Sequence, residues 1–300
     1  MKIAIAGGTG MVGKKFSNLL LKSGHEVIVL TRGENRYQNG IRFVNWLTNS
    51  ATPETALEGI DAFVNLAGVS LNDGRWTVQQ KEKIYQSRMK STDEVLRIIK
   101  ALQNKPHVYI NASAVGIYPV STTTIYTENS TLKAKDFLGT VVQHWEQRAL
   151  EVEELGIRTC LTRFGVILAK DEGALPLMTL PYRLGVGGTV GSGKQWISWI
   201  HIDDVANALL FVIENETLTG PINFTSPNVK QMRNFGKSIG AAFHRPHWLP
   251  VPSIALKLAL GEKSALVLEG QYVMPEKLLQ ANFPFKFISV EDAITDLYSN

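Results

Sequence analysis

Apolar residues follow two different patterns along the first part of the chain. Short runs of consecutive apolar residues are typical of strands buried on both faces, and longer segments with apolar residues every three or four positions are typical of helices. Strands are predicted at 2–6, 26–31, 41–46, 62–66, 107–112 and 158–164, and helical spacing follows at about 11–23, 77–102 and 137–155. This alternation predicts an α/β fold, a Rossmann-type doubly wound parallel sheet, with a polar loop at 33–40.

The pattern of predicted helices and strands changes in the second half of the chain. Helices are predicted at 175–184 and 202–214, and strands at 196–201 and 220–226; from Val229 onward short helical segments, including 275–281 and 290–298, are separated by prolines. We expect a first domain at 1–175, joined by the strand and helix at 197–226. The substrate-side region is then 176–300, with a smaller, mostly helical C-terminal module at about 246–298.

The stretch Lys2 to Gly13 joins the first strand to the first helix through a glycine-rich turn, Gly7-Gly8-Thr9-Gly10-Met11-Val12-Gly13. In a dinucleotide-binding turn, one glycine adopts backbone angles closed to other residues, another admits the pyrophosphate, and the last lets the helix pack closely. The helix start then offers free N–H groups to the phosphates. A glycine turn that binds nothing is the alternative, but the strand–turn–helix context favours nucleotide binding.

The end of the second predicted strand bears on the choice of cofactor. An acidic residue there binds the ribose hydroxyls of NAD, whereas an arginine accommodates the 2′-phosphate of NADP. Here the strand ends in Thr31-Arg32, and the nearest acid, Glu34, comes later. Arg32 could also be a solvated loop charge; we expect NADP.

Further candidates lie at or after other strand ends, where ligands bind to such sheets. Small residues follow the fourth strand, in Asn65-Leu66-Ala67-Gly68, and would let a nucleotide pass close to the backbone. Arg88, on the helix that follows, is expected to face the cofactor. Ser113 ends the fifth strand, with Tyr118 shortly after it.

Composition narrows the function classes. The net charge of +4 is spread along the chain without a Lys/Arg block, so no nucleic-acid partner is expected. No apolar stretch approaches the ~20 residues of a membrane-spanning helix, and the short N-terminal apolar run is unlike a signal peptide. We therefore expect a cytoplasmic protein with no membrane partner.

Two other motifs are considered and set aside. Gly188 to Lys194 approaches a phosphate-binding P-loop, but Gln195 replaces the Ser or Thr that would hold Mg²⁺, and the flanking strand and helix are not evident. A flexible loop over a substrate pocket is the preferred interpretation. His244 and His247 have no further ligand cluster nearby, so no metal site is predicted.

These residues together resemble a known group. The glycine turn, the Asn65–Gly68 strand end and the His201-Ile202-Asp203-Asp204 segment are similar to the extended short-chain dehydrogenase/reductase (SDR) superfamily of the nucleotide-sugar epimerase type. Within that superfamily the chain resembles epimerase-family proteins of the SDR39-like or "SulA-like" kind, which have a C-terminal domain of unknown function. This narrower resemblance rests on Gly68 with Arg75-Trp76, Ser87-Arg88, Trp145-Glu146, 173–175, 184–204 and 275–279. It implies that NADP contacts Gly7, Thr9, Gly10, Met11, Val12, Thr31, Arg32, Leu66, Ala67, Gly68, Lys83, Arg88 and Ile167.

The same resemblance shows that this chain lacks a residue pair that the superfamily usually uses for catalysis. The superfamily usually carries Tyr-x-x-x-Lys, in which the lysine lowers the tyrosine pKa for proton transfer. No tyrosine here has lysine four residues later, and if Glu146 marks the register, Leu138 and Val142 stand in the two positions. Ser113 matches the superfamily serine, and either Tyr118 or His201 would be the proton donor.

Two functions remain open at this point. One is an NADP-dependent oxidoreductase or epimerase of unusual mechanism that acts on a small carbonyl or sugar-type substrate. The other is a non-catalytic NADP(H)-binding sensor or a regulatory protein associated with cell division. The sequence is compatible with a homodimer.

Overall fold

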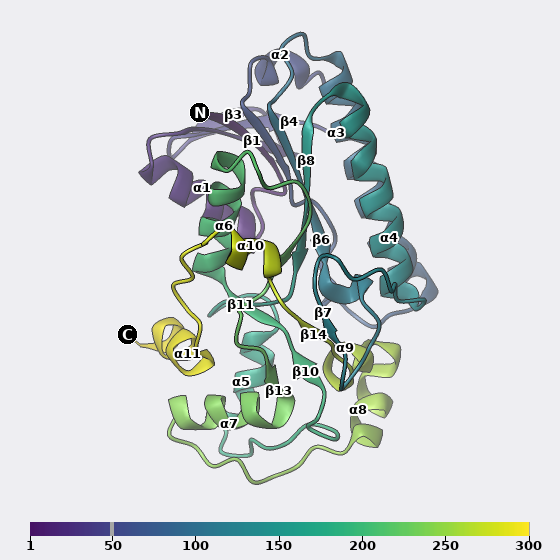
Figure 1. Cartoon of the computed structure of the whole chain (residues 1–300), viewed down its shortest axis with the longest axis vertical. Coiled ribbons are helices and arrows are strands. Elements are labelled where there is room, and N and C mark those ends of the chain that lie inside the picture. Colours follow the sequence, from purple (N-terminus) through teal and green to yellow (C-terminus); the bar gives the residue numbers. More distant parts are fainter. Residues whose placement is uncertain (49–50, 300) are drawn as a thin grey trace.

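The computed structural model describes residues 1–48 and 51–299 (Figure 1). Its centre is an eight-stranded sheet with the order β12-β8-β6-β5-β1-β2-β4-β3, in which every neighbouring pair is parallel except β3 and β4. The strands are β1 Lys2–Ala6, β2 Glu26–Thr31, β3 Arg36–Gln38, β4 Ile41–Asn45, β5 Ala62–Asn65, β6 Val108–Ala114, β8 Arg158–Phe164 and β12 Gly220–Phe224. The predicted Rossmann-type sheet is confirmed.

Helices cover both faces of this sheet, as Figure 1 shows with α1 and α6 on one side and α3 and α4 on the other. The first strand explains the layering, because Ile3 and Ile5 belong to one apolar core and Ala4 and Ala6 to the other. The helices are α1 Met11–Lys22, α2 Glu54–Leu57, α3 Val78–Ala101, α4 Phe137–Leu150, α5 Leu175–Arg183, α6 Ile202–Glu214, α7 Met232–Ala242, α8 Ser253–Leu260, α9 Ala265–Leu268, α10 Glu276–Gln280 and α11 Val290–Tyr298.

The region after β8 adds a smaller unit at the carboxyl ends of the strands. Its core joins α5, α7 and α11 through side chains such as Leu175, Phe235 and Ile294. Three short two-stranded sheets tie it together: β9 Val166–Leu168 with β11 Trp199–His201, β10 Trp196–Ile197 with β13 Lys230–Gln231, and β7 Ile125–Tyr126 with β14 Tyr272–Val273. Within the described residues, none of the helices is both long and apolar enough to span a bilayer.

Four local predictions were wrong. Residues 33–40, predicted as a loop, contain β3, which forms a hairpin with β4 through Asn39 and Gly40, both at positive φ. The predicted helix 137–155 ends at Leu150 and continues as the 3₁₀ turn Glu151–Leu155. No strand was predicted between 112 and 137, but β7 lies there. The strand predicted at 196–201 is divided at Ser198, because its two halves pair with different partners.

Candidate functional site

The glycine turn after β1 lies against the end of β5, so that two predicted parts of the cofactor site are in contact. Gly7 has φ of +78°, and a Cβ there would stand 2.7 Å from the carbonyl carbon and oxygen of Leu66. A Cβ on Gly13 would stand 2.4 Å from the Cα of Gly8. Glycine is therefore required at Gly7 for backbone conformation and at Gly13 for the close packing of α1 on the turn.

The first turn of α1 is free to receive an anion. Gly10 is the N-cap, no side chain caps the helix, and no acidic residue lies in its first turn. The leading N–H groups of an α-helix have no partner within the helix, and its N-terminus carries a partial positive charge. Met11 and Val12 therefore present backbone donors beside the turn, an arrangement that fits the pyrophosphate of a dinucleotide.

A second segment reaches the start of α1 from the end of the sheet. The space beside Gly173 is bounded by the Ile167 carbonyl oxygen and the Met11 sulfur, each 3.6 Å from the place of a Cβ. The structure thus brings Ile167 and Met11, more than 150 residues apart in sequence, to the same edge.

The backbone after β5 is held by three side chains on one face of α3. Ser87 Oγ accepts the Val69 N–H at 3.1 Å, Ser91 Oγ donates to the Ala67 carbonyl at 3.4 Å, and Arg88 Nη1 donates to the Val69 carbonyl at 3.3 Å. The Arg88 guanidinium also lies over the Trp145 ring, 5.1 Å from its centroid. Burial lowers the pKa of Arg88 to about 10, so the group remains a cation at neutral pH.

Arg88 thus lies beside Gly68, and its contact with the cofactor stays a prediction. A Cβ on Gly68 would stand 3.4 Å from the Arg88 guanidinium carbon. The same prediction did not include Ser91, which the helical spacing from Ser87 and Arg88 could have identified. Lys83 is exposed on α3 and makes no hydrogen bond or ion pair with any residue that the structure describes.

All thirteen predicted cofactor residues remain at least partly accessible, whereas the residues proposed for chemistry do not. Ser113 is 2% exposed, Tyr118 1% and His201 0%. This contrast separates a surface that can receive a ligand from side chains that the fold encloses.

The hydroxyls of Ser113 and Tyr118 belong to one buried network. Ser113 Oγ donates to Glu146 Oε1 at 2.5 Å, and Arg163 binds both oxygens of Glu146, through Nε at 2.7 Å and Nη2 at 2.8 Å. Arg163 Nη1 donates to Tyr118 Oη at 2.7 Å, and Tyr118 donates to Asn223 Oδ1 at 2.9 Å. The network therefore connects β6, α4, β8 and β12.

The geometry of this network shifts the pKa values of Tyr118 and Arg163. Burial raises the pKa of Tyr118, against the opposing effect of the Arg163 charge. Burial alone would lower the pKa of Arg163, but its hydrogen bonds to Glu146 and the charge of that carboxylate raise it. Sequence reasoning missed Arg163, because an arginine inside a buried strand has no local signal that reveals its partner.

His201 is the N-cap of α6. Its Nδ1 accepts the Asp203 N–H at 3.1 Å, and burial lowers its pKa to about 4, so the ring is neutral at pH 7. Nε2 then carries the proton and lies 3.5 Å from Asp296 Oδ2. His201, Asp203 and Asp296 have metal-ligand spacing, but a protonated Nε2 cannot ligate, and Lys15 and Lys286 already neutralise the carboxylates.

Leu138 and Val142, predicted at the positions of the superfamily tyrosine and lysine, lie near the start of α4. Leu138 Cβ lies 3.7 Å from the position that a Cβ on Gly116 would occupy, and Val142 is buried against Tyr118 and Tyr126. Both side chains are apolar, so neither can act as an acid or base.

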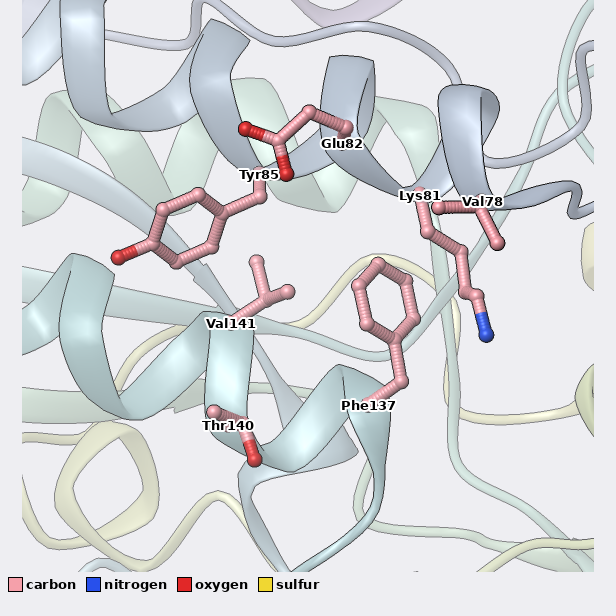
Figure 2. Close-up of a pocket in the computed structure, with 7 residues that line it drawn as sticks. All are labelled: Val78, Lys81, Glu82, Tyr85, Phe137, Thr140 and Val141. Carbon is pink, nitrogen blue, oxygen red and sulfur yellow. The ribbon is translucent and has the colours of Figure 1, made fainter.

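A separate hollow of about 410 Å³ lies on the outer surface between α3 and α4. Figure 2 shows the rings of Tyr85 and Phe137 and the side chain of Val141 facing it. Its remaining lining residues are Val78, Lys81, Glu82 and Thr140. None of the predicted cofactor or catalytic residues lines it, so it is not the predicted site.

Comparison with known proteins places this geometry in a family. The family model described as "NAD dependent epimerase/dehydratase family" matches residues 3–223, and "Domain of unknown function (DUF1731)" matches residues 251–297. The chain is 44% identical to "Epimerase family protein YfhF" of Bacillus subtilis (strain 168) over 100% of this chain and 99% of that protein.

Solved structures agree with these matches. The crystal structure of human epimerase family protein SDR39U1 (isoform 2) with NADPH is similar with a TM-score of 0.89 and 30% identity, over 100% of both chains. A nucleoside-diphosphate sugar epimerase from Corynebacterium glutamicum has a TM-score of 0.80 and 29% identity, over 100% of this chain and 59% of that one.

Proposed function

This chain belongs to the NAD dependent epimerase/dehydratase family, the extended SDR type with a DUF1731 C-terminal domain, and from that premise we propose that it binds NADP(H) at the carboxyl edge of its sheet. Members of this family bind a nicotinamide cofactor. The observation that carries the proposal is the uncapped start of α1 beside a turn in which Gly7 admits nothing larger than hydrogen.

Different residues bind different parts of the cofactor. Met11 and Val12 donate backbone N–H groups to the pyrophosphate, and the Leu66–Gly68 backbone, held by α3, lies beside the turn. Arg32, exposed at the end of β2, faces the 2′-phosphate that distinguishes NADP from NAD. The NADPH bound to the human relative supports the choice of the phosphorylated cofactor.

We propose further that the protein is an oxidoreductase or epimerase-like enzyme for a small carbonyl or sugar-type substrate. When bound, the cofactor supplies or accepts a hydride. Ser113 as the group that polarises the substrate carbonyl, with Tyr118 as proton donor, stays a prediction. An acid or base must come within hydrogen-bond reach of the reacting atom, so either hydroxyl would have to exchange its present partner for the substrate.

One observation favours a second candidate, a non-catalytic NADP(H)-binding sensor. The Ser113 hydroxyl is committed to Glu146 and the Tyr118 hydroxyl to Asn223, and both side chains are buried. A protein that only binds the cofactor needs neither group to be accessible.

The experiment that tests the cofactor proposal is a fluorescence titration of the purified protein with NADPH. We expect saturable binding by the wild-type protein and loss of binding in Gly7→Val, whose side chain would collide with Leu66. A Gly24→Ala variant is the matched control, because Gly24 also has a positive φ but has no atom within 4 Å of its Cβ position. Equal affinity of wild type and Gly7→Val would place the cofactor elsewhere.

A second experiment separates enzyme from sensor. NADPH oxidation is followed at saturating cofactor with a broad panel of aldehydes, ketones and sugar nucleotides. Turnover that Ser113→Ala abolishes would support the enzyme, turnover unchanged in that variant would remove Ser113 from the site, and binding without turnover across the panel would support the sensor.

A further inference from the structure

We propose that Arg36 is a second binding residue for the 2′-phosphate and that, together with Arg32, it sets the preference for NADP(H) over NAD(H). This inference rests on the proposed NADP(H) binding and adds a residue to it. Arg36 lies outside the strand-end position that sequence reasoning examines, because the chain reaches it only through the turn between β2 and β3.

The space beside Gly33 is bounded by two polar atoms. A Cβ on Gly33 would stand 3.6 Å from Thr31 Oγ1 and 3.7 Å from Arg36 Nη1, and apart from Gly33 and its two chain neighbours no other described residue has an atom within 4 Å of that point. A hydroxyl and a guanidinium thus flank one open position at the end of β2. That position directly follows Arg32, where the adenosine ribose of a dinucleotide binds in this fold.

Packing fixes the direction of the Arg36 side chain. Its guanidinium carbon lies 4.0 Å from the centroid of the Phe43 ring, and its Nη1 donates to the Glu34 carbonyl at 3.4 Å. Stacking of this kind leaves most guanidinium N–H donors available in the plane of the group. Arg36 is therefore oriented before a ligand arrives, which reduces the entropy lost on binding.

Hydrogen bonds connect the turn that carries this space to the neighbouring strand. Asn45 donates through Nδ2 to the Gly33 carbonyl at 2.8 Å, and its own N–H is accepted by Asn35 Oδ1 at 2.6 Å. The Gly33 N–H is accepted by Thr31 Oγ1 at 3.1 Å. These bonds hold residues 31–35 in one shape, so the positions of Thr31 and Arg36 are linked.

Charge points to an anion as the occupant. Arg32 and Arg36 are both exposed, and neither forms an ion pair with any residue in 1–48 or 51–299. The exposed carboxylate of Glu34 lies in the same turn, and a doubly charged phosphate beside Arg32 and Arg36 would receive charge-assisted hydrogen bonds from their guanidinium groups. Guanidinium groups suit phosphate because their donors match its oxygens in pairs.

The adjoining strand offers a matched control in Arg42. Arg36 is paired across the hairpin with Phe43, whereas Arg42 is paired with Tyr37, so the two arginines project from opposite faces. Arg42 is exposed and shares a hollow on the hairpin with Arg36, but it has no atom within 4 Å of the Cβ position of Gly33. Arg42→Ala removes the same charge from the same hairpin without touching the space beside Gly33.

The test measures dissociation constants for NADPH and NADH, and for adenosine 2′,5′-bisphosphate and 5′-AMP, with the wild type and the variants Arg36→Ala, Gly33→Ala and Arg42→Ala. We expect Arg36→Ala to weaken NADPH and the bisphosphate by about tenfold or more, as for loss of a charge-assisted contact. NADH and 5′-AMP should change less than about twofold. Gly33→Ala should weaken the same two ligands, because its methyl group enters the space between Thr31 and Arg36.

The outcomes distinguish this inference from the proposal beneath it. An unchanged NADPH-to-NADH ratio in Arg36→Ala overturns the inference alone, as does an equal loss in Arg36→Ala and Arg42→Ala. Absence of NADPH binding by the wild-type protein overturns the proposed function instead. Thermal unfolding of each variant without ligand, expected to match the wild type, shows that the changes in affinity do not come from misfolding.

Discussion

Removal of the Glu146 carboxylate should destabilise the protein more than any other polar substitution considered, because it leaves a cation enclosed. Arg163 is 2% exposed and binds both Glu146 oxygens, at 2.7 and 2.8 Å. Loss of one partner of such a buried pair costs about 3–5 kcal/mol, since the remaining charge keeps its desolvation penalty without compensation. Glu146→Leu should therefore reduce the folding equilibrium constant by a factor of about 100 to 1,000 or more.

Urea unfolding followed by tryptophan fluorescence measures this cost. The control is the double variant Glu146→Leu, Arg163→Met, which replaces the ion pair with apolar side chains of similar size. We expect it to recover at least half of the lost free energy of unfolding, because no charge remains buried. A cost below about 1 kcal/mol in the single variant, or no recovery in the double variant, would refute the view that Arg163 depends on Glu146.

Two further predictions concern individual helices. Thr77→Ala should cost about 1 kcal/mol in urea unfolding, because Thr77 Oγ1 caps α3 by accepting the Gln80 N–H at 3.2 Å, whereas Thr140→Ala, on an exposed position of α4, should cost less. His201 has a pKa of about 4 when folded, below its usual 6.5, so the unfolded state binds more protons between these values. The contribution of His201 to stability should be complete above pH 6.5, and the free energy of unfolding should fall by up to about 1.4 kcal/mol per pH unit as the pH drops toward 4. The variant His201→Asn keeps a capping acceptor and should flatten this dependence. An unchanged slope in the variant would mean that other groups cause the pH dependence.

The sheet could be predicted from the sequence because its strands are buried on both faces. β2 then contains an apolar run from Val27 to Leu30, and the predicted limits of β2 and β8 coincide with the observed ones. The edge strand β3 could not be found in this way, because all of its residues are exposed and no apolar pattern remains. The division at Ser198 escaped prediction for a related reason, since it depends on which distant strands pair with each half.

The residues of the candidate site also differ in how far the sequence could reveal them. Gly7 in the turn and Arg88 after a strand end were singled out from spacing and context, and their contact with a cofactor stays a prediction. The partners of Ser113 were not, because Glu146 and Arg163 come from two other elements and meet only in the folded protein. Arg36 escaped because the hairpin that carries it was itself unrecognised.

The central claim is that the edge formed by the glycine turn and the end of β2 receives a phosphorylated nicotinamide cofactor. Its most direct test is the ratio of the dissociation constants of the wild-type protein for NADH and NADPH, measured by equilibrium fluorescence titration in one buffer. We expect NADPH to bind at least about tenfold more tightly, through the charge-assisted contacts of its 2′-phosphate. Equal affinities, or tighter binding of NADH, would contradict it.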